Sequence, residues 1–355
     1  MWLTLGALLA GCDTETEWLS VEPFEGGEVV SRLDREGGSE VTAWRTPPLA
    51  VGSWFRADLM RVHGTLATER IDVVAVPTSV VEVRHRLDGK DHVALELAVT
   101  GPGEGRVVPR GLRRDAGVPI EVIARRAEEA RMTAFEVGGD RSRDLEPDEV
   151  LHALPEDELG VDVELLDEGG EALSGYDAVI ATVGGDLSVR TESDGQRTLL
   201  YLDGLNPAPP EVVSVASGDG QALSRFQVHV HGFDEVEDFR VIVGSFAVTA
   251  EVDVAGGAVF APMMETHTER SGWLRASSFA IGDGGPTTAT LCLAGADLCE
   301  DVDLPGPIVP SDDANFWDAL CGCSQGGRPG GAAGLALAFA LLRRGRVPPR
   351  DRHKG

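Results

Sequence analysis

Lysine is almost absent from this chain. Among its 355 residues, Lys90 and Lys354 are the two lysines, and the other basic side chains are arginines. Acidic residues outnumber basic ones by 59 to 31, which gives a net charge of −28. A chain this acidic repels nucleic acid and anionic membrane surfaces, and it attracts divalent cations loosely. We therefore expect no nucleic-acid partner.

The short motifs of common enzyme classes are also missing. No G-x-S-x-G, H-E-x-x-H, Walker or G-x-G-x-x-G element opens a helix. Tyrosine occurs twice, so no aromatic sugar-binding platform is evident, and we interpret Trp18, Trp44 and Trp54 as core or strand-end residues. We predict a protein that is not an enzyme, and an exported hydrolase with a site on its loops is the alternative.

Helical periodicity is scarce, and apolar residues instead alternate with polar ones. The alternation recurs in HVALELAVT, VDVELLD, FQVHVHG and VTAEVDV. Each segment predicts a half-buried strand, and glycine-containing turns separate these segments. Two stretches have helical character: RRAEEARM, which we expect to join two domains, and residues 147–159, which could form one short turn ended by Pro155. The predicted fold class is all-β, with β-sandwiches in tandem and a short apolar helix at the C-terminus.

The body of the chain resembles the bacterial Ig-like domain families. The resemblance rests on the LAVGSWFRADL opening at 49–59, the strand at 79–83, the turn and strand at 103–108, and the hairpin at 161–182. It implies three sandwiches, at 13–127, 128–213 and 214–305, followed by a Pro-rich linker at 306–320. Domains of this kind serve mostly as spacers, adhesive modules or lattice pieces.

The chain has five cysteines, of which two lie in the body. If Leu293 and Leu298 close a four-residue loop at 294–297, Cys292 and Cys299 would face each other across a hairpin. Leu291, Leu293 and Leu298 would share the opposite face. We predict a disulfide, which an oxidising compartment favours; two free thiols are the alternative, and a metal site of two cysteines is weaker still.

The C-terminal region, 321–355, has the features of a localisation signal. A Cys-Gly-Cys head (Cys321, Gly322, Cys323) precedes an uncharged run at 330–342 and a basic end that starts with Arg343 and Arg344. An apolar segment followed by arginines is typical of a membrane stop with its basic end in the cytoplasm, although 13 residues span only ~20 Å as a helix. A terminal core helix is the alternative.

This tail resembles the MYXO-CTERM type of sorting signal. The resemblance implies export, recognition by a membrane processing enzyme of the rhombosortase or myxosortase kind, and display on the cell surface. A cysteine of the head is then the expected processing point.

The N-terminal residues 1–12, MWLTLGALLAGC, look like a lipoprotein signal with Cys12 as the lipidated residue. An ordinary signal peptide or a short apolar N-terminus is the alternative. Asp13, next to the lipidation site, can mean retention at the inner membrane, which competes with surface display.

Two groups of residues have the spacing of metal ligands. His229 and His231 lie two apart on one predicted strand beside Gln227, but no third ligand is identifiable, so we interpret them as solvent-facing. Of the remaining histidines, His63, His85, His92, His152 and His267 are scattered and form no evident constellation. Asp140, Ser142, Asp144 and Glu146 alternate like a calcium loop but lack the EF-hand pattern, so calcium is a weak candidate and an acidic surface loop the alternative.

Together these features predict a non-catalytic protein of the cell envelope, acting as an adhesive or structural spacer. Its partners would be the export and sorting machinery, components of the envelope or of a neighbouring cell, and the membrane through its ends. A calcium-stabilised adhesin is the alternative within the same class. We expect no cofactor.

Overall fold

The computed structural model describes most of the body of the chain. Its residues are 18–20, 28–33, 39–61, 72–88, 92–110, 119–137, 141–203, 205–268 and 272–309. Several predicted features lie outside these residues: the lipidation site Cys12, the calcium candidate Asp140, and the tail with Cys321, Gly322, Cys323, Arg343, Arg344 and its apolar run.

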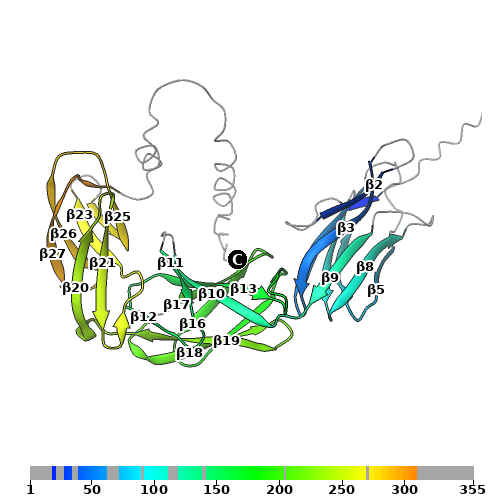
Figure 1. Cartoon of the computed structure of the whole chain (residues 1–355), viewed down its shortest axis with the longest axis horizontal. Helices are drawn as coiled ribbons and strands as arrows, with labels where there is room; N and C mark the ends of the chain where they lie inside the picture. The colour runs from blue at the N-terminus through cyan, green and yellow to red at the C-terminus, as the bar shows by residue number, and fades with distance from the viewer. Residues whose placement is uncertain are drawn as a thin grey trace, which may run out of the picture.

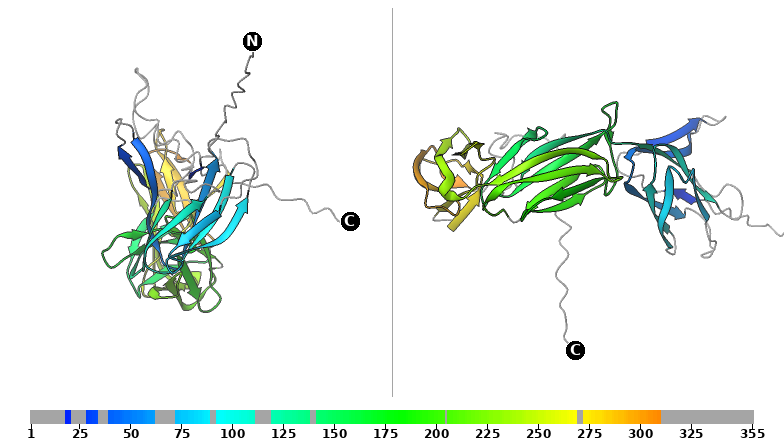
Figure 2. Two further views of the ribbon diagram at one scale, coloured as in Figure 1. Left: turned by 90° about the vertical axis from the view of Figure 1, so that its right-hand side faces the viewer. Right: turned by 90° about the horizontal axis from the view of Figure 1, so that it is seen from below.

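Throughout the described residues the protein is built of β-strands, with a single 3-10 turn, η1 (Phe233–Glu235). The all-β prediction is confirmed. Six sheets form three sandwiches that follow one another in a row (Figure 1). Seen from below, the three sandwiches together form an elongated body (Figure 2). No helix in the described part of the chain is long and apolar enough to cross a membrane.

The first sandwich precedes residue 126. One sheet has the order β1 (Trp18–Ser20), β4 (Trp54–Arg61), β7 (His92–Val99), β6 (Val81–Asp88), and the other the order β2 (Glu28–Leu33), β3 (Ser39–Ala50), β9 (Ile120–Arg125), β8 (Gly103–Arg110), β5 (Asp72–Val76). The alternation in β7 points Val93, Leu95, Leu97 and Val99 into the core between the sheets. Strands β3 and β9 pair in parallel.

The second sandwich lies in the middle of the row. One sheet has the order β11 (Ser142–Leu145), β10 (Glu129–Glu136), β13 (Leu159–Leu166), β17 (Thr198–Asp203), β16 (Ser188–Ser193), with β14 (Ala172–Leu173) beside β13. The facing sheet has the order β12 (Val150–Ala153), β19 (Ala222–Val230), β18 (Ala208–Ser217), β15 (Val179–Val183). Because β18 and β19 complete this sheet, the second sandwich extends to Val230, and the boundary expected at residue 213 is wrong.

The two stretches expected to have helical character contain strand and turn, and no helix. RRAEEARM runs into β10, where Ala130, Met132 and Ala134 are buried at alternate positions. The segment 147–159 holds β12, in which Leu151 and Ala153 are buried. In both, tertiary burial with a period of two overrides a local helical preference.

The third sandwich closes the described chain. One sheet has the order β20 (Val236–Val243), β21 (Ala247–Val254), β25 (Ser278–Ile281), β28 (Ile308–Val309), with β22 (Gly257–Ala258) beside β21, and the other the order β24 (Gly272–Ala276), β23 (Met264–Thr268), β26 (Thr287–Leu293), β27 (Cys299–Leu304). Its core includes Val248, Met264, Phe279 and Leu291.

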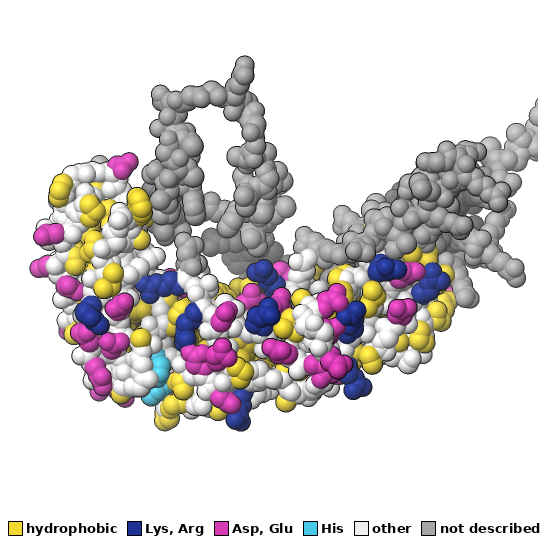
Figure 3. Space-filling view, in the orientation of Figure 1, with side chains coloured by type: hydrophobic (Ala, Val, Ile, Leu, Met, Phe, Trp, Pro, Cys, Tyr) yellow, Lys and Arg dark blue, Asp and Glu magenta, His cyan; other side chains and the backbone are white. Residues whose placement is uncertain are grey.

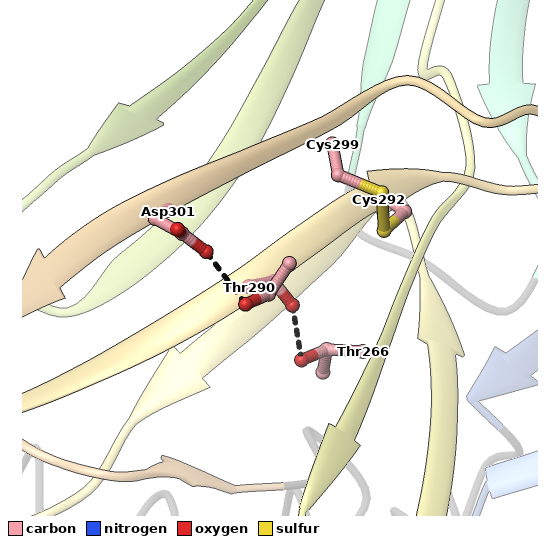
Figure 4. Close-up of a disulfide and its surroundings, with 5 residues drawn as sticks. All are labelled: Thr266, Thr290, Cys292, Cys299 and Asp301. Atoms are coloured by element: carbon pink, nitrogen blue, oxygen red, sulfur yellow. Dashed lines mark hydrogen bonds between the residues drawn. A yellow bond between two sulfur atoms is a disulfide. The ribbon is translucent and has the colours of Figure 1, made fainter.

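The predicted disulfide joins β26 to β27 (Figure 4). Cys292 and Cys299 are direct register partners, with Cα atoms 4.0 Å apart. Leu291 and Leu293 face the core as expected, but Leu298 is 38% exposed because it closes the hairpin loop, where its carbonyl accepts a hydrogen bond from the N–H of Leu293.

Removing this disulfide should lower the stability only modestly, because it closes a loop of few residues. We expect the double variant Cys292→Ser, Cys299→Ser to lose about 2 kcal/mol of unfolding free energy. Thermal unfolding with and without reductant measures the loss. Reductant should lower the melting temperature of the wild type and leave that of the double variant unchanged; equal responses would contradict a disulfide that stabilises the fold.

The first and second sandwiches are joined by paired backbone. The N–H groups of Trp54 and Tyr176 each donate to the other residue's carbonyl, at 3.0 and 2.8 Å, and their rings stack with centroids 4.6 Å apart. The indole N–H of Trp54 also donates to Asp177, at 2.8 Å. Beside them the backbone of Gly52 lies directly against that of Gly218. The junction is therefore a packed contact with its own hydrogen bonds.

The second and third sandwiches are also joined through hydrogen bonds and a core. Leu154, which follows β12, is buried with Val252, Val254, Val259 and Leu293 of the third sandwich. Asp157 accepts hydrogen bonds from the backbone N–H of Leu154, at 2.7 Å, and of Met263, at 3.1 Å. One buried aspartate side chain thus ties the two sandwiches together.

Candidate metal centre

A cluster of three histidines lies on the outer face of the middle sandwich, beside this second junction. Strands β12 and β19 run in parallel, with Leu151 opposite Val228 and His152 opposite His229. Leu151 and Val228 are buried in the core, so the alternation turns His152 and His229 to the other face. His231 follows β19 and shares the face of His229; its N–H donates to the carbonyl of Ala153 at 2.9 Å.

The three imidazoles converge. One ring nitrogen from each of His152, His229 and His231 lies within 4.8 Å of the other two. Nδ1 of His152 is 2.8 Å from Nε2 of His231, and the rings of His229 and His231 have centroids 3.8 Å apart. Three imidazole nitrogens that face one point match the donor set of a Zn²⁺ centre.

The third sandwich covers part of the cluster. The hairpin between β21 and β22 places Gly256 and Gly257 against the ring of His152; a Cβ added at Gly257 would lie 3.0 Å from two ring atoms. The N–H of Phe260 donates to the carbonyl of His152 at 3.0 Å. His231 is only 1% exposed, so the cluster lies at the seam between the two sandwiches. Histidine side chains reach the surface at this seam (Figure 3).

Glu235 supports the cluster from the segment that connects the two sandwiches. It ends η1, and its Oε2 lies 2.8 Å from Nδ1 of His231. A carboxylate that accepts the outer N–H of a histidine fixes the ring and leaves the inner nitrogen free as a ligand. The position of Glu235 therefore orients Nε2 of His231 toward the other two rings.

The surroundings of His152 and His229 disfavour a positive charge on these two rings. Burial lowers the pKa of His152, and the neighbouring His231 and His229 lower it further. Burial also lowers the pKa of His229, again with a contribution from His231. Neutral imidazole is the form that binds a metal ion.

An open groove of about 770 Å³ lies in front of the cluster. His152 and His229 line it from the middle sandwich, and residues 255–260 line it from the third. Arg143 and Glu149 also line it; they form an ion pair with each other. A ligand bound by the three histidines would therefore keep one side open to solvent.

Sequence reasoning found two of the three histidines and missed His152. The solvent-facing interpretation is wrong for the buried His231. His85 and His267 do not join the cluster, and the ring of His267 instead lies against Trp273 with centroids 5.4 Å apart. The side chains of His63 and His92 lie outside the described residues. The one local hint was VLHA, where His152 lies between two apolar residues, but four residues are too few to establish a strand.

The calcium candidates that the structure describes are exposed. Asp144, in β11, accepts a hydrogen bond from the hydroxyl of Thr133 at 3.3 Å, and the N–H of Glu146 donates to Glu149 at 2.9 Å. Asp140, the first residue of the pattern, lies outside the described residues. The calcium interpretation stays a prediction.

Comparison with known proteins identifies remote structural likenesses. No family model and no curated protein matches the chain. Domains 1–6 of the S-layer protein SbsC are 14% identical with a TM-score of 0.29, covering 83% of this chain and 40% of that chain. Invasin, a bacterial integrin-binding protein, is 13% identical with a TM-score of 0.24, covering 75% and 62%. A tandem of titin Ig domains is 11% identical with a TM-score of 0.22, covering 58% and 98%. Similarity at this level gives no information about function.

Proposed function

We propose that this protein is a non-catalytic spacer or adhesive module of the cell envelope, built of tandem Ig-like sandwiches. The observation that carries the proposal is the pair of packed junctions. Backbone pairing at Trp54 and Tyr176 holds the first, and the Asp157 side chain with its surrounding core holds the second. Such junctions hold an extended shape, which is what a spacer needs.

The disulfide and the two ends of the chain support a location in the cell envelope. A disulfide between Cys292 and Cys299 suits an oxidising compartment outside the cytoplasm. The lipoprotein-like start at Cys12 and the sorting-type tail with Cys321, Gly322, Cys323, Arg343 and Arg344 would then hold the acidic body at the membrane and present it at the surface.

Two measurements test this proposal. Small-angle X-ray scattering of the full chain should give the elongated profile of three sandwiches in a row, and a profile of freely jointed domains would contradict the spacer. Cell fractionation with mass spectrometry of both termini should find Cys12 modified and the chain in the envelope fraction. An unmodified chain in the cytosol would contradict the location.

One observation favours a second candidate, an exported metal-dependent hydrolase. Three histidines beside an open groove are also the ligand set of catalytic zinc centres, which keep one position for water. Among the described residues, Glu149 is the carboxylate that lines the groove, and it is paired with Arg143 and so is poorly placed as a general base. Assays of the zinc-loaded protein with ester, phosphoester and peptide substrates should show no turnover; turnover that His229→Gln abolishes would establish the second candidate.

A further inference from the structure

The geometry points to a site for one divalent transition-metal ion, Zn²⁺ by its ligands, held by His152, His229 and His231 at the seam between the second and third sandwiches. The inference does not depend on the proposed function. The ion would act as a structural clamp on the junction.

The ring nitrogens are turned toward one another by what lies outside them. Nδ1 of His231 faces the Glu235 carboxylate at 2.8 Å, which leaves Nε2 of the same ring on the side of His152. Gly256 and Gly257 lie against the Nε2 side of the His152 ring. Nδ1 of His152 faces Nε2 of His231 at 2.8 Å.

Two imidazole nitrogens at that distance either share a proton in an N–H···N hydrogen bond or coordinate a common metal ion. A metal ion uses both lone pairs and adds that of His229, whose ring already lies against His231. Zn–N bonds of ~2.0–2.1 Å separate tetrahedral ligands by roughly 3.3 Å, so small ring rotations suffice.

The ligand types select the ion. All three donors are imidazoles, which suit Zn²⁺, Cu²⁺ and Ni²⁺, whereas Ca²⁺ and Mg²⁺ require oxygen ligands. The fourth position faces the groove and would take a water molecule.

The surroundings explain why binding would stiffen the junction. His152 contacts Gly256 and Gly257 of the third sandwich, and Glu235 lies in the connecting segment. An ion that fixes the rings therefore fixes the surface against which the hairpin rests and the segment that leads into it. The expected effect is a higher melting temperature and slower proteolysis between the two sandwiches.

The test uses the full chain with its free cysteines alkylated, so that thiols in the terminal segments do not bind the metal. After dialysis against a chelator, isothermal titration with ZnCl₂ should show that one ion binds per chain. Thermal unfolding should then show a higher melting temperature in the presence of ZnCl₂. His229→Gln should abolish both. Glu235→Ala, which removes the acceptor that holds the His231 ring, should weaken binding by ~10–100-fold. His267→Gln, a histidine of the third sandwich outside the cluster, should bind as the wild type does.

The competing outcomes are distinct. Zinc binding that His229→Gln leaves unchanged, or a wild type that binds no zinc, would overturn the inference. Should His229→Gln fail to fold, X-ray absorption spectroscopy of the zinc-loaded wild type decides: imidazole ligands support the site, and a shell of oxygen alone overturns it. A melting temperature that responds to CaCl₂ but not to ZnCl₂ would also overturn it and would favour the calcium alternative.

Discussion

Gly52→Ala is expected to separate the first sandwich from the second. Gly52 has a φ of +88°, and an added Cβ would lie 2.1 Å from the backbone nitrogen of Asp219 and 2.2 Å from the carbonyl carbon of Gly218. Neither backbone atom can move without breaking the junction. We expect a loss of about 3 kcal/mol or more in the free energy of unfolding, measured by guanidinium denaturation, and new proteolytic cleavage near the junction.

Gly220 supplies a matched control for this experiment. Its φ is +89°, almost the same as that of Gly52, but a Cβ added there meets nothing within 4 Å. Gly220→Ala therefore introduces the backbone strain without the clash. We expect it to lower the free energy of unfolding by only ~1 kcal/mol. Equal losses in the two variants would show that the contact between the sandwiches contributes nothing beyond the strain.

The second large effect is a fall in stability as the pH rises, caused by Asp157. Its side chain is buried, and burial raises the pKa of the carboxyl to about 7, although hydrogen bonds from Leu154 and Met263 lower it in part. Because the pKa in the folded protein lies above that of the unfolded chain, near 3.9, the contribution of Asp157 is fully present below about pH 4 and is lost as the pH rises to 7. The loss over the whole window is roughly 4 kcal/mol, with the larger part between pH 5 and 7.

Denaturation of the wild type and of Asp157→Asn at pH 5 and pH 8 measures this effect. The variant should be less stable at pH 5, because an amide offers one oxygen to the two N–H donors, but its stability should change less between the two pH values. Repulsion among the many surface carboxylates acts on both proteins alike and cancels in the comparison. Parallel pH dependences would show that Asp157 is not the titrating group.

The strands were predictable wherever the burial pattern is local. In β19, Phe226, Val228 and Val230 alternate with polar residues in the sequence and are buried in the structure. The disulfide followed from the same alternation, since Cys292 and Cys299 flank a loop of hairpin length. In these cases a few neighbouring residues contain the whole signal.

His152 could not be found in the same way, because what makes it a ligand is its partner strand. The segment 147–159 is rich in helix-forming residues, and β12 has only four residues, too few for a clear period of two. Its parallel pairing with β19 brings together residues far apart in the chain, and no local pattern encodes that register. Asp157 was missed for a similar reason, since its burial depends on a third sandwich that begins much later in the sequence.

The pairing of β12 with β19 also sets an order of events during synthesis. A chain that emerges from its N-terminus delivers β12 early, but the strand has no partner in its sheet until β19 has followed. The middle sandwich therefore cannot close until residues 222–230 have been made, and the first sandwich, whose described strands all lie in the first 125 residues, can finish beforehand. Folding would then proceed one sandwich at a time from the N-terminus.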